Sequence, residues 1–307
     1  MSSTSTRGMQ LALCTAGISG VAVFLNSYGV KTFDDPASYT TVKNSVAALT
    51  LLAVVAALTA TSGRVVTRPT GRRQWAALGL VRVIGGSVPF LLFFEGLSRA
   101  SSAETAFVHK TLVVWVALLA VPLLSERVGP LQWGAIGLLV VGQASLAGGV
   151  TAPLHMSWGS GELMVLAATL CWAVETVLAK RLLGGMSSWT VGLARMCLGS
   201  AVLIGWAVLR GQASGLVGLT AEQLGWVVLT GLLLAGYVGT WFAALARAQA
   251  VDVTAVLVVG ALVTAVLSAV VDGTALGPQL GGLVLVGAGG ALVVLGARRV
   301  PEAVQVT

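Results

Sequence analysis

The sequence contains ten long apolar stretches separated by short polar loops. Each stretch has about 20 residues, which is the length an α-helix needs to cross a hydrocarbon core of roughly 30 Å. Because a segment in lipid must satisfy its own backbone hydrogen bonds, these stretches are predicted to be helices. The alternating ten-residue segments of a β-barrel are absent from the sequence. The predicted spans cover residues 9–30, 38–60, 75–97, 103–124, 130–149, 158–179, 187–209, 223–246, 251–271 and 277–297.

The second half of the sequence repeats the first half at an offset of 148 residues. The matched pairs are Arg99-Ala100 with Arg247-Ala248, Glu104 with Asp252, and Gly129-Pro130 with Gly277-Pro278. Each half holds five spans, and two like halves with odd span counts must cross the bilayer in opposite orientations. The sequence therefore predicts two inverted five-helix repeats, residues 1–150 and 151–307, in one integrated membrane domain with a central site.

The charge content of the chain supports a membrane protein. Only 9% of the residues are charged and 56% are hydrophobic, whereas soluble domains carry roughly 25% charged residues. The net charge of +7 does not indicate a nucleic-acid partner, because the basic residues lie in short loops between apolar stretches.

The loop charges also predict the orientation. An even number of spans puts both termini on one side, and that side carries eleven Lys and Arg residues against three on the other. By the positive-inside rule both termini are expected to be cytoplasmic, with the protein in the cytoplasmic membrane.

Among the residues within the predicted spans, six charged residues and a histidine are the candidates for the site, because each charge in a span costs about 2.5–3.5 kcal/mol on insertion scales. They are Lys43, Arg82, Glu95, Lys110, Glu175 and Arg195, with His109. One hypothesis places Lys43, Arg195 and Glu175 around a central cavity. The cations would then attract a carboxylate or phosphate of the solute, and Glu175 would bind an amine or carry a proton. The alternative is structural ion pairing, Glu175 with Arg195 and Glu95 with Lys110.

Several uncharged residues are further candidates for the cavity wall. They are Tyr39, Asn44, Trp115, Trp172 and Trp241. For the tryptophans, packing in the core of the bundle is the alternative interpretation. Pro89 lies in the middle of the third span and is predicted to kink that helix, which would free backbone carbonyls where a solute could bind.

The sequence carries none of the common catalytic or nucleotide-binding motifs. There is no G-x-x-x-x-G-K-[ST], no H-E-x-x-H and no nucleophile elbow, so no enzyme activity and no cofactor are expected. Neither histidine lies in a Cys or carboxylate cluster, so no metal site is expected. The 39 glycines are interpreted as helix-packing residues, with a homodimer face as the alternative.

Two sequence motifs resemble those of a known family. Residues 95–104 (EGLSRASSAE) and 124–134 (LSERVGPLQWG) are similar to signatures of the EamA-type members of the drug/metabolite transporter superfamily. The second half repeats them as residues 244–252 (ALARAQAVD) and 277–282 (GPQLGG). The resemblance implies a ten-helix fold of two inverted repeats and secondary transport of small solutes across the cytoplasmic membrane, often outward. The family commonly has Arg where this chain has Lys43.

These observations predict a secondary transporter, and an exporter in particular, of small polar or amphipathic metabolites. It would work by alternating access in the lipid bilayer, as a monomer or homodimer, with a proton as a possible coupling ion. Two alternatives stay open. One is a facilitator or exchanger of phosphorylated or nucleotide-linked solutes. The other is a non-transporting membrane protein with an assembly or lipid-handling role.

Overall fold

The computed structural model describes residues 3–97, 99–100, 102–147 and 158–297. All regular elements in these ranges are helical. The predicted boundary between halves at residue 150 and the basic pair Arg298-Arg299 lie outside the described residues. The first half contains α1 (Ser3–Gly29), η1 (Val30–Thr32), α2 (Pro36–Ser62), α3 (Arg72–Gly86), α4 (Val88–Leu97), α5 (Ser102–Lys110), α6 (Leu112–Leu124) and α7 (Pro130–Leu146). The second half contains α8 (Ser160–Leu182), α9 (Ser188–Leu193), the π-helix η3 (Ala194–Leu198), α10 (Gly199–Leu209), η4 (Ala213–Leu216), α11 (Ala221–Leu245), α12 (Ala250–Val258), α13 (Gly260–Val271), η5 (Gly277–Gln279) and α14 (Leu280–Ala297).

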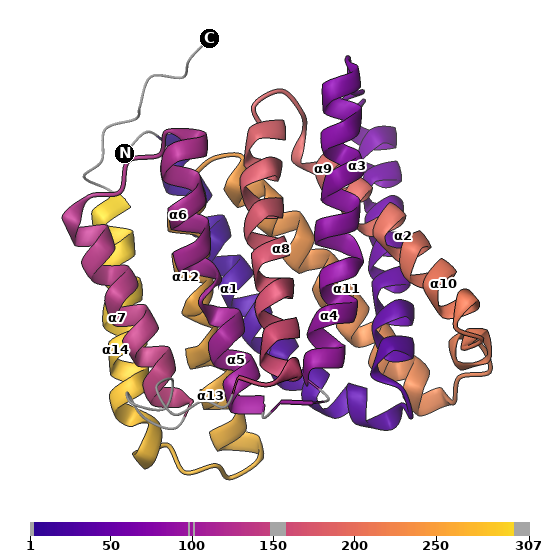
Figure 1. Cartoon of the computed structure of the whole chain (residues 1–307). Coiled ribbons are helices and arrows are strands. Elements are labelled where there is room, and N and C mark those ends of the chain that lie inside the picture. Colours follow the sequence, from indigo (N-terminus) through magenta and orange to yellow (C-terminus); the bar gives the residue numbers. More distant parts are fainter. Residues whose placement is uncertain (1–2, 98, 101, 148–157, 298–307) are drawn as a thin grey trace.

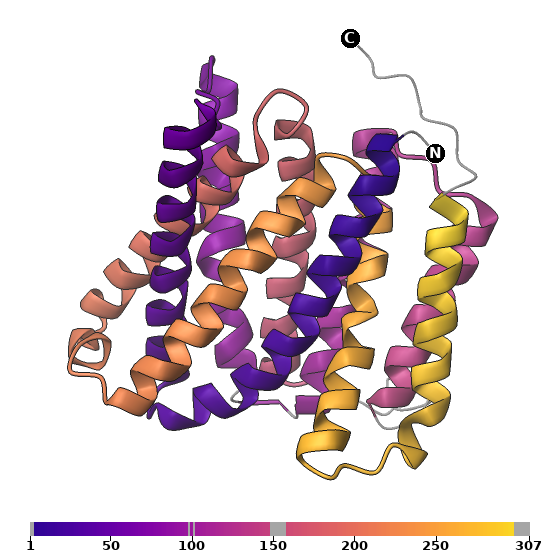
Figure 2. The same ribbon diagram turned by 180° about the vertical axis from the view of Figure 1, so that it is seen from behind.

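The helical segments match the predicted spans. Nine of them, within the described ranges, are long and apolar enough to cross a membrane. The tenth is α7, whose 17 residues run antiparallel to α14 along the side of the bundle (Figures 1 and 2). The prediction of an all-helical membrane protein with a ten-helix plan is therefore confirmed.

The two halves run in opposite directions through the bundle. In Figure 1, α1 begins at the upper end, whereas its counterpart α8 begins at the lower end. The last helix, α14, finishes at the upper end, where α1 begins (Figure 2). We call this upper end the proximal end and the opposite one the distal end. The described chain thus enters and leaves the bundle on one side, as an even number of crossings requires.

The halves interlock through equivalent helices. Helix α1 packs against α11, α12 and α13 of the second half, and α8 packs against α3, α4, α5 and α6 of the first half. Helices α7 and α14, the last of each half, pack against each other. The first helix of each half is therefore surrounded by helices of the other half, which places the interface between halves at the centre of the bundle.

Four of the spans are interrupted partway. The fourth span breaks at Thr111 between α5 and α6, and the ninth breaks at Val259 between α12 and α13. These two residues are 148 positions apart, so the same break occurs in both halves. The third span breaks at Ser87, two residues before Pro89, where a kink was predicted. The seventh span is interrupted by η3.

Glycines allow the closest helix approaches. A Cβ atom on Gly86 would lie 2.2 Å from the backbone oxygen of Arg195 and 3.0 Å from the Cα of Gly199. A Cβ on Gly142 would lie 3.0 Å from the oxygen of Gly282 on α14. These contacts are between helices of the same chain, in agreement with the packing interpretation of the glycines.

Candidate functional site

A cavity of about 280 Å³, with charged and aromatic side chains in its wall, lies between the two halves. Its walls come from α1, α2, α4, α5, α6, α8, η3, α11 and α12, so both halves contribute. Its polar and aromatic lining residues are Ser19, Asn26, Lys43, Phe90, Phe93, Phe94, His109, Lys110, Trp172, Glu175, Thr176, Arg195, Thr230, Tyr237 and Trp241. Seven of the eleven residues predicted for the site therefore line one shared cavity: Lys43, His109, Lys110, Trp172, Glu175, Arg195 and Trp241.

An ion pair from the second half forms one side of this cavity. Arg195 Nε lies 2.9 Å from Glu175 Oε1, and both side chains are buried. The two atoms do not meet hydrogen-bond geometry, so the contact is an ion pair without a well-directed hydrogen bond. Arg195 sits in the π-helix η3, a distortion that occurs frequently at functional sites. Gly85 makes room for the pair, because a Cβ there would lie 2.3 Å from Glu175 Cδ.

The first half supplies a similar cation with a neutral partner. Lys43 Nζ donates to Asn26 Oδ1 at 3.1 Å, and Lys43 is buried. Asn26 lies on the first helix of its half and matches Glu175 at an offset of 149 residues. Each half thus places a cation from its second helix against a polar residue of its first helix. Only the second half uses a carboxylate as the partner.

The cavity therefore carries an excess of positive charge. Lys43, Lys110 and Arg195 face a single carboxylate, Glu175. Among the residues that the structure describes, no carboxylate lies within ion-pair distance of Lys43 or Lys110. His109 also lines the cavity, and its Nδ1 atom has no hydrogen-bond partner among the described residues. A buried cation without a counter-ion is costly, so this arrangement favours an anionic occupant.

Aromatic rings form much of the remaining wall. Trp172 contacts the rings of Phe90, Phe93 and His109 at centroid distances of 5.4, 5.6 and 5.0 Å. On the second half, Tyr237 and Trp241 stack at 5.9 Å. Trp172 Nε1 also donates to the carbonyl of Gly85 at 3.2 Å, next to the break in the third span. The cavity thus offers cations for a charged group and ring faces for an apolar or aromatic body.

Four of the predicted site residues lie outside this cavity. Tyr39 is buried beside it, with its hydroxyl 2.6 Å from Asn26 Oδ1 and 2.9 Å from Thr230 Oγ1. Asn44 is buried, and its amide has no hydrogen-bond partner among the described residues. Trp115 Nε1 donates to Thr111 Oγ1 at 3.0 Å.

Glu95 is the fourth. It is exposed and pairs with Arg99 at 2.5 Å, so the suggested pairing of Glu95 with Lys110 is wrong, whereas that of Glu175 with Arg195 is present. The cause is local spacing, since Arg99 follows the end of α4 and lies only four residues after Glu95.

Sequence reasoning missed several residues of the cavity wall. Asn26 was not proposed as a site residue, although its match to Glu175 at an offset of 149 residues is a signal that could have found it. Tyr237 lies four residues before Trp241 and so shares its helix face, which is a signal that periodicity could have found. Phe90, Phe93 and Phe94 gave no signal, because apolar residues also face lipid.

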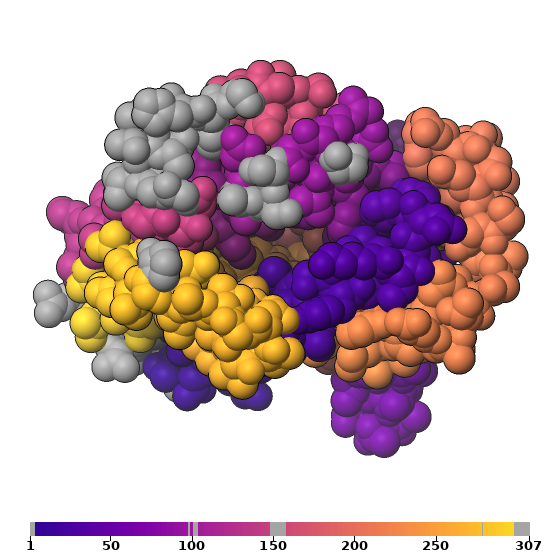
Figure 3. Space-filling view, turned by 90° about the horizontal axis from the view of Figure 1, so that it is seen from below, coloured from indigo at the N-terminus to yellow at the C-terminus, as the bar shows by residue number. Residues whose placement is uncertain are grey.

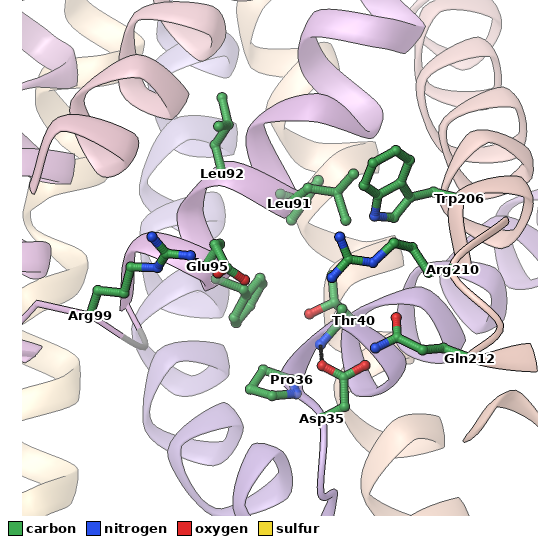
Figure 4. Close-up of a pocket in the computed structure, with 13 residues that line it drawn as sticks. Asp35, Pro36, Thr40, Leu91, Leu92, Glu95, Arg99, Trp206, Arg210 and Gln212 are labelled. Atoms are coloured by element: carbon green, nitrogen blue, oxygen red, sulfur yellow. Dashed lines mark hydrogen bonds and ion pairs between the residues drawn. The ribbon is translucent and has the colours of Figure 1, made fainter. Parts of the chain in front are cut away.

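A second hollow, which we call the vestibule, lies at the distal end. It has a volume of about 380 Å³ and is lined by Asp35, Pro36, Ala37, Thr40, Phe90, Leu91, Leu92, Phe94, Glu95, Arg99, Trp206, Arg210 and Gln212. Figure 4 shows Glu95 and Arg99 on one side of it and Trp206, Arg210 and Gln212 on the other. Viewed from the distal end, the molecule also shows a hollow near its centre, between the indigo, purple and yellow segments (Figure 3). The vestibule and the central cavity share Phe90 and Phe94 as lining residues.

Polar contacts join the two halves at the proximal end. The Glu126 carboxylate accepts hydrogen bonds from the backbone N–H groups of Ala250 and Val251, at 2.6 and 3.1 Å, and so caps α12. Gln132 Nε2 donates to Asp252 Oδ1 at 2.6 Å. Burial raises the pKa of the Glu126 carboxyl, although the two N–H groups act in the opposite direction. The helix that Glu126 caps belongs to the other half of the chain.

We expect Glu126→Gln to loosen this proximal contact. An amide oxygen replaces the carboxylate at the N-terminus of α12, and losing such a cap costs about 0.5–2 kcal/mol. The equilibrium should then shift toward a proximally open state by roughly two- to thirtyfold. The measurement is the rate at which an impermeant thiol reagent, added from the proximal side, labels Ser19→Cys in the cavity.

The matched control for this variant is Glu162→Gln. Glu162 accepts from Gly159 N at 2.9 Å and caps α8 within its own half. The Glu162→Gln variant should be labelled at the same rate as the parent protein. Equal rates in both variants would show that Glu126 is only a helix cap.

Taken together, two inverted halves around a shared cavity that contains buried charges define a class of multi-pass α-helical membrane proteins that move solutes. The sequence matches the EamA-like transporter family twice, over residues 6–147 and 159–296. The chain belongs to this family.

Individual proteins are also similar to this chain. The inner membrane protein YtfF of Escherichia coli (strain K12) is 28% identical over 131 residues, which cover 40% of this chain and 41% of that protein. The chain thus matches less than half the length of this relative. A solved crystal structure superposes with a TM-score of 0.75 at 19% identity, covering 96% of this chain and 99% of the other. At 19% identity, the similarity to this crystal structure shows a shared fold.

Proposed function

We propose that the protein is a secondary transporter of small organic anions that carry an apolar or aromatic body. The observation that carries this proposal is the charge of the central cavity, where Lys43, Lys110 and Arg195 face the single carboxylate of Glu175. An anionic head group would bind between Lys43 and Arg195, and its body would pack on the Trp172 and Trp241 sides. The volume of about 280 Å³ is at the lower end for ligand sites, which favours a small solute over a nucleotide-linked one.

Transport would proceed by alternating access between the two ends of the bundle. The vestibule, which shares Phe90 and Phe94 with the cavity, would give the cavity a route to the distal end. The contacts of Glu126 and Gln132 would close the proximal end. The two inverted halves contribute equivalent helices to the cavity, so rocking one half against the other exchanges the open end. No ATP-binding motif is present, so the solute gradient or a coupled ion supplies the energy.

Proton coupling would follow from the ion pair. An anion that binds Arg195 competes with Glu175 for the guanidinium, which lies 2.9 Å away. A buried carboxylate that loses its counter-ion is costly, and protonation removes that cost. Anion and proton would therefore bind together and move in the same direction. With the termini in the cytoplasm, as the loop charges favour, the vestibule faces outward.

A thermal-shift screen of the purified protein tests this substrate class. The probes are small carboxylates such as benzoate and phenylacetate, phosphate monoesters, and the neutral amides of the same carboxylic acids. A ligand at 100 times its Kd stabilises the native state by about 2.7 kcal/mol. We expect the melting temperature to rise with carboxylates and to stay unchanged with the matched amides. Equal shifts with acids and amides would reject the role of charge.

A further inference from the structure

Two phenylalanines on α4 lie between the vestibule and the central cavity. Phe90 and Phe94 line both hollows, whereas Leu91 and Leu92 line only the vestibule and Phe93 lines only the central cavity. Phe90 and Phe94 are four residues apart and therefore lie on one face of the helix. A solute that passes from the vestibule to the cavity must pass these two rings.

Each ring contacts one of the two cationic side chains that we propose bind the solute. Lys43 Nζ lies 5.5 Å from the centroid of the Phe94 ring, and Arg195 Cζ lies 5.8 Å from that of Phe90. Both distances are within the roughly 6 Å range of cation–π attraction. The contacts come from opposite halves of the chain, since Lys43 lies on α2 and Arg195 on η3.

The helix that carries the rings is separated from the helix before it. Helix α4 begins at Val88, directly after the break at Ser87, and has ten residues. The Ser87 hydroxyl donates to the carbonyl of Val83 at 3.1 Å, which satisfies a backbone group at the end of α3. The break gives α4 a place to pivot relative to α3 without disturbing a continuous helix.

We propose that Phe90 and Phe94 form a gate between the vestibule and the central cavity, held shut by Lys43 and Arg195 and released when an anion takes these cations. A cation that binds a carboxylate offers less charge to a ring face, so the anion weakens the contacts that hold the rings. The gate then opens more readily for an anion than for a neutral molecule of the same shape. The release step rests on the proposed function, whereas the closed gate does not.

The test is the labelling of Ser19→Cys, a position in the central cavity, by an impermeant methanethiosulfonate reagent added from the distal side. The native residues Cys14, Cys171 and Cys197 are first replaced by alanine. Phe94→Leu keeps most of the bulk but removes the ring, and a cation–π contact corresponds to roughly a two- to thirtyfold change in equilibrium. We expect Phe94→Leu to raise the labelling rate within that range and Phe94→Ala to raise it further.

The control is Val88→Ala, on the same helix but outside both hollows, and its rate should match that of the parent. If Phe94→Ala is labelled at the same rate as the parent protein, the gate is overturned. If Phe94→Leu is labelled at the parent rate while Phe94→Ala is labelled faster, the cation–π contacts do not hold the gate shut. No solute is present in this assay, so its failure is separate from a failure of anion transport. The melting temperature of each variant confirms that it is folded.

Discussion

Lys43→Ala is expected to weaken the binding of the best-stabilising carboxylate by about 10- to 100-fold, because a hydrogen bond to a charged group contributes about 1.5–3 kcal/mol. Lys43 is the better of the two cations for this test. Its partner Asn26 is neutral, so removing Lys43 leaves no buried charge unpaired. Removing Arg195 would leave Glu175 without a counter-ion, and breaking a buried pair in this way costs about 3–5 kcal/mol of stability. A loss of binding in Lys43→Ala can therefore be attributed to the missing cation, because this variant is expected to stay folded.

The matched variant is Lys43→Arg, which keeps the charge. We expect it to retain affinity within about threefold, because the guanidinium still presents donors to the carboxylate. The measurement is the dependence of the melting temperature on ligand concentration. Wild-type affinity in Lys43→Ala would show that this cation is structural, and equal losses in both variants would show that shape, and not charge, matters.

Glu175→Gln is expected to abolish the dependence of uptake on a pH gradient while exchange of the anion continues. Glutamine keeps the shape of the side chain but can no longer gain or lose a proton. It also no longer neutralises Arg195, which lies 2.9 Å away in the wild type. Because the anion no longer competes with a carboxylate, its affinity should be equal to or higher than that of the wild type.

Two flux assays in proteoliposomes check this prediction. One applies a pH gradient and the other applies only a gradient of labelled against unlabelled anion. Glu222→Gln is the control, since Glu222 is exposed in the first turn of α11. Unchanged pH-gradient dependence in Glu175→Gln would remove the proton role from this residue, and loss of both activities would show that Glu175 is needed for binding or folding.

The ten spans and their pairing in two halves could be predicted because lipid imposes simple rules on a sequence. Each span needs about 20 apolar residues, and each half shows this pattern five times. The break at Ser87 was also predictable, since Pro89 follows it. The matching breaks at Thr111 and Val259 were not, because neither residue disfavours a helix strongly enough to mark an interruption in sequence.

The candidate site was predictable where it depends on charge. Lys43, Lys110, Glu175 and Arg195 are conspicuous in apolar spans, and the structure places all of them around one cavity. The sequence could not tell which charges pair, because that depends on helix rotation. Glu95 illustrates this, since it points into the vestibule beside Arg99 and away from Lys110. The phenylalanines of α4 were not identifiable at all, because a ring that faces a cavity and a ring that faces lipid look the same in a sequence.

The most direct test of the account is solute counterflow with the purified protein in liposomes. The vesicles are loaded with an unlabelled carboxylate from the stabilising set, and the same labelled anion is added outside. At anion concentrations near the wild-type Kd, we predict transient accumulation of the label by the wild type and by Lys43→Arg, and much less accumulation by Lys43→Ala. A folded wild-type protein that accumulates none of these anions would contradict the account and would favour a different solute or a non-transporting role.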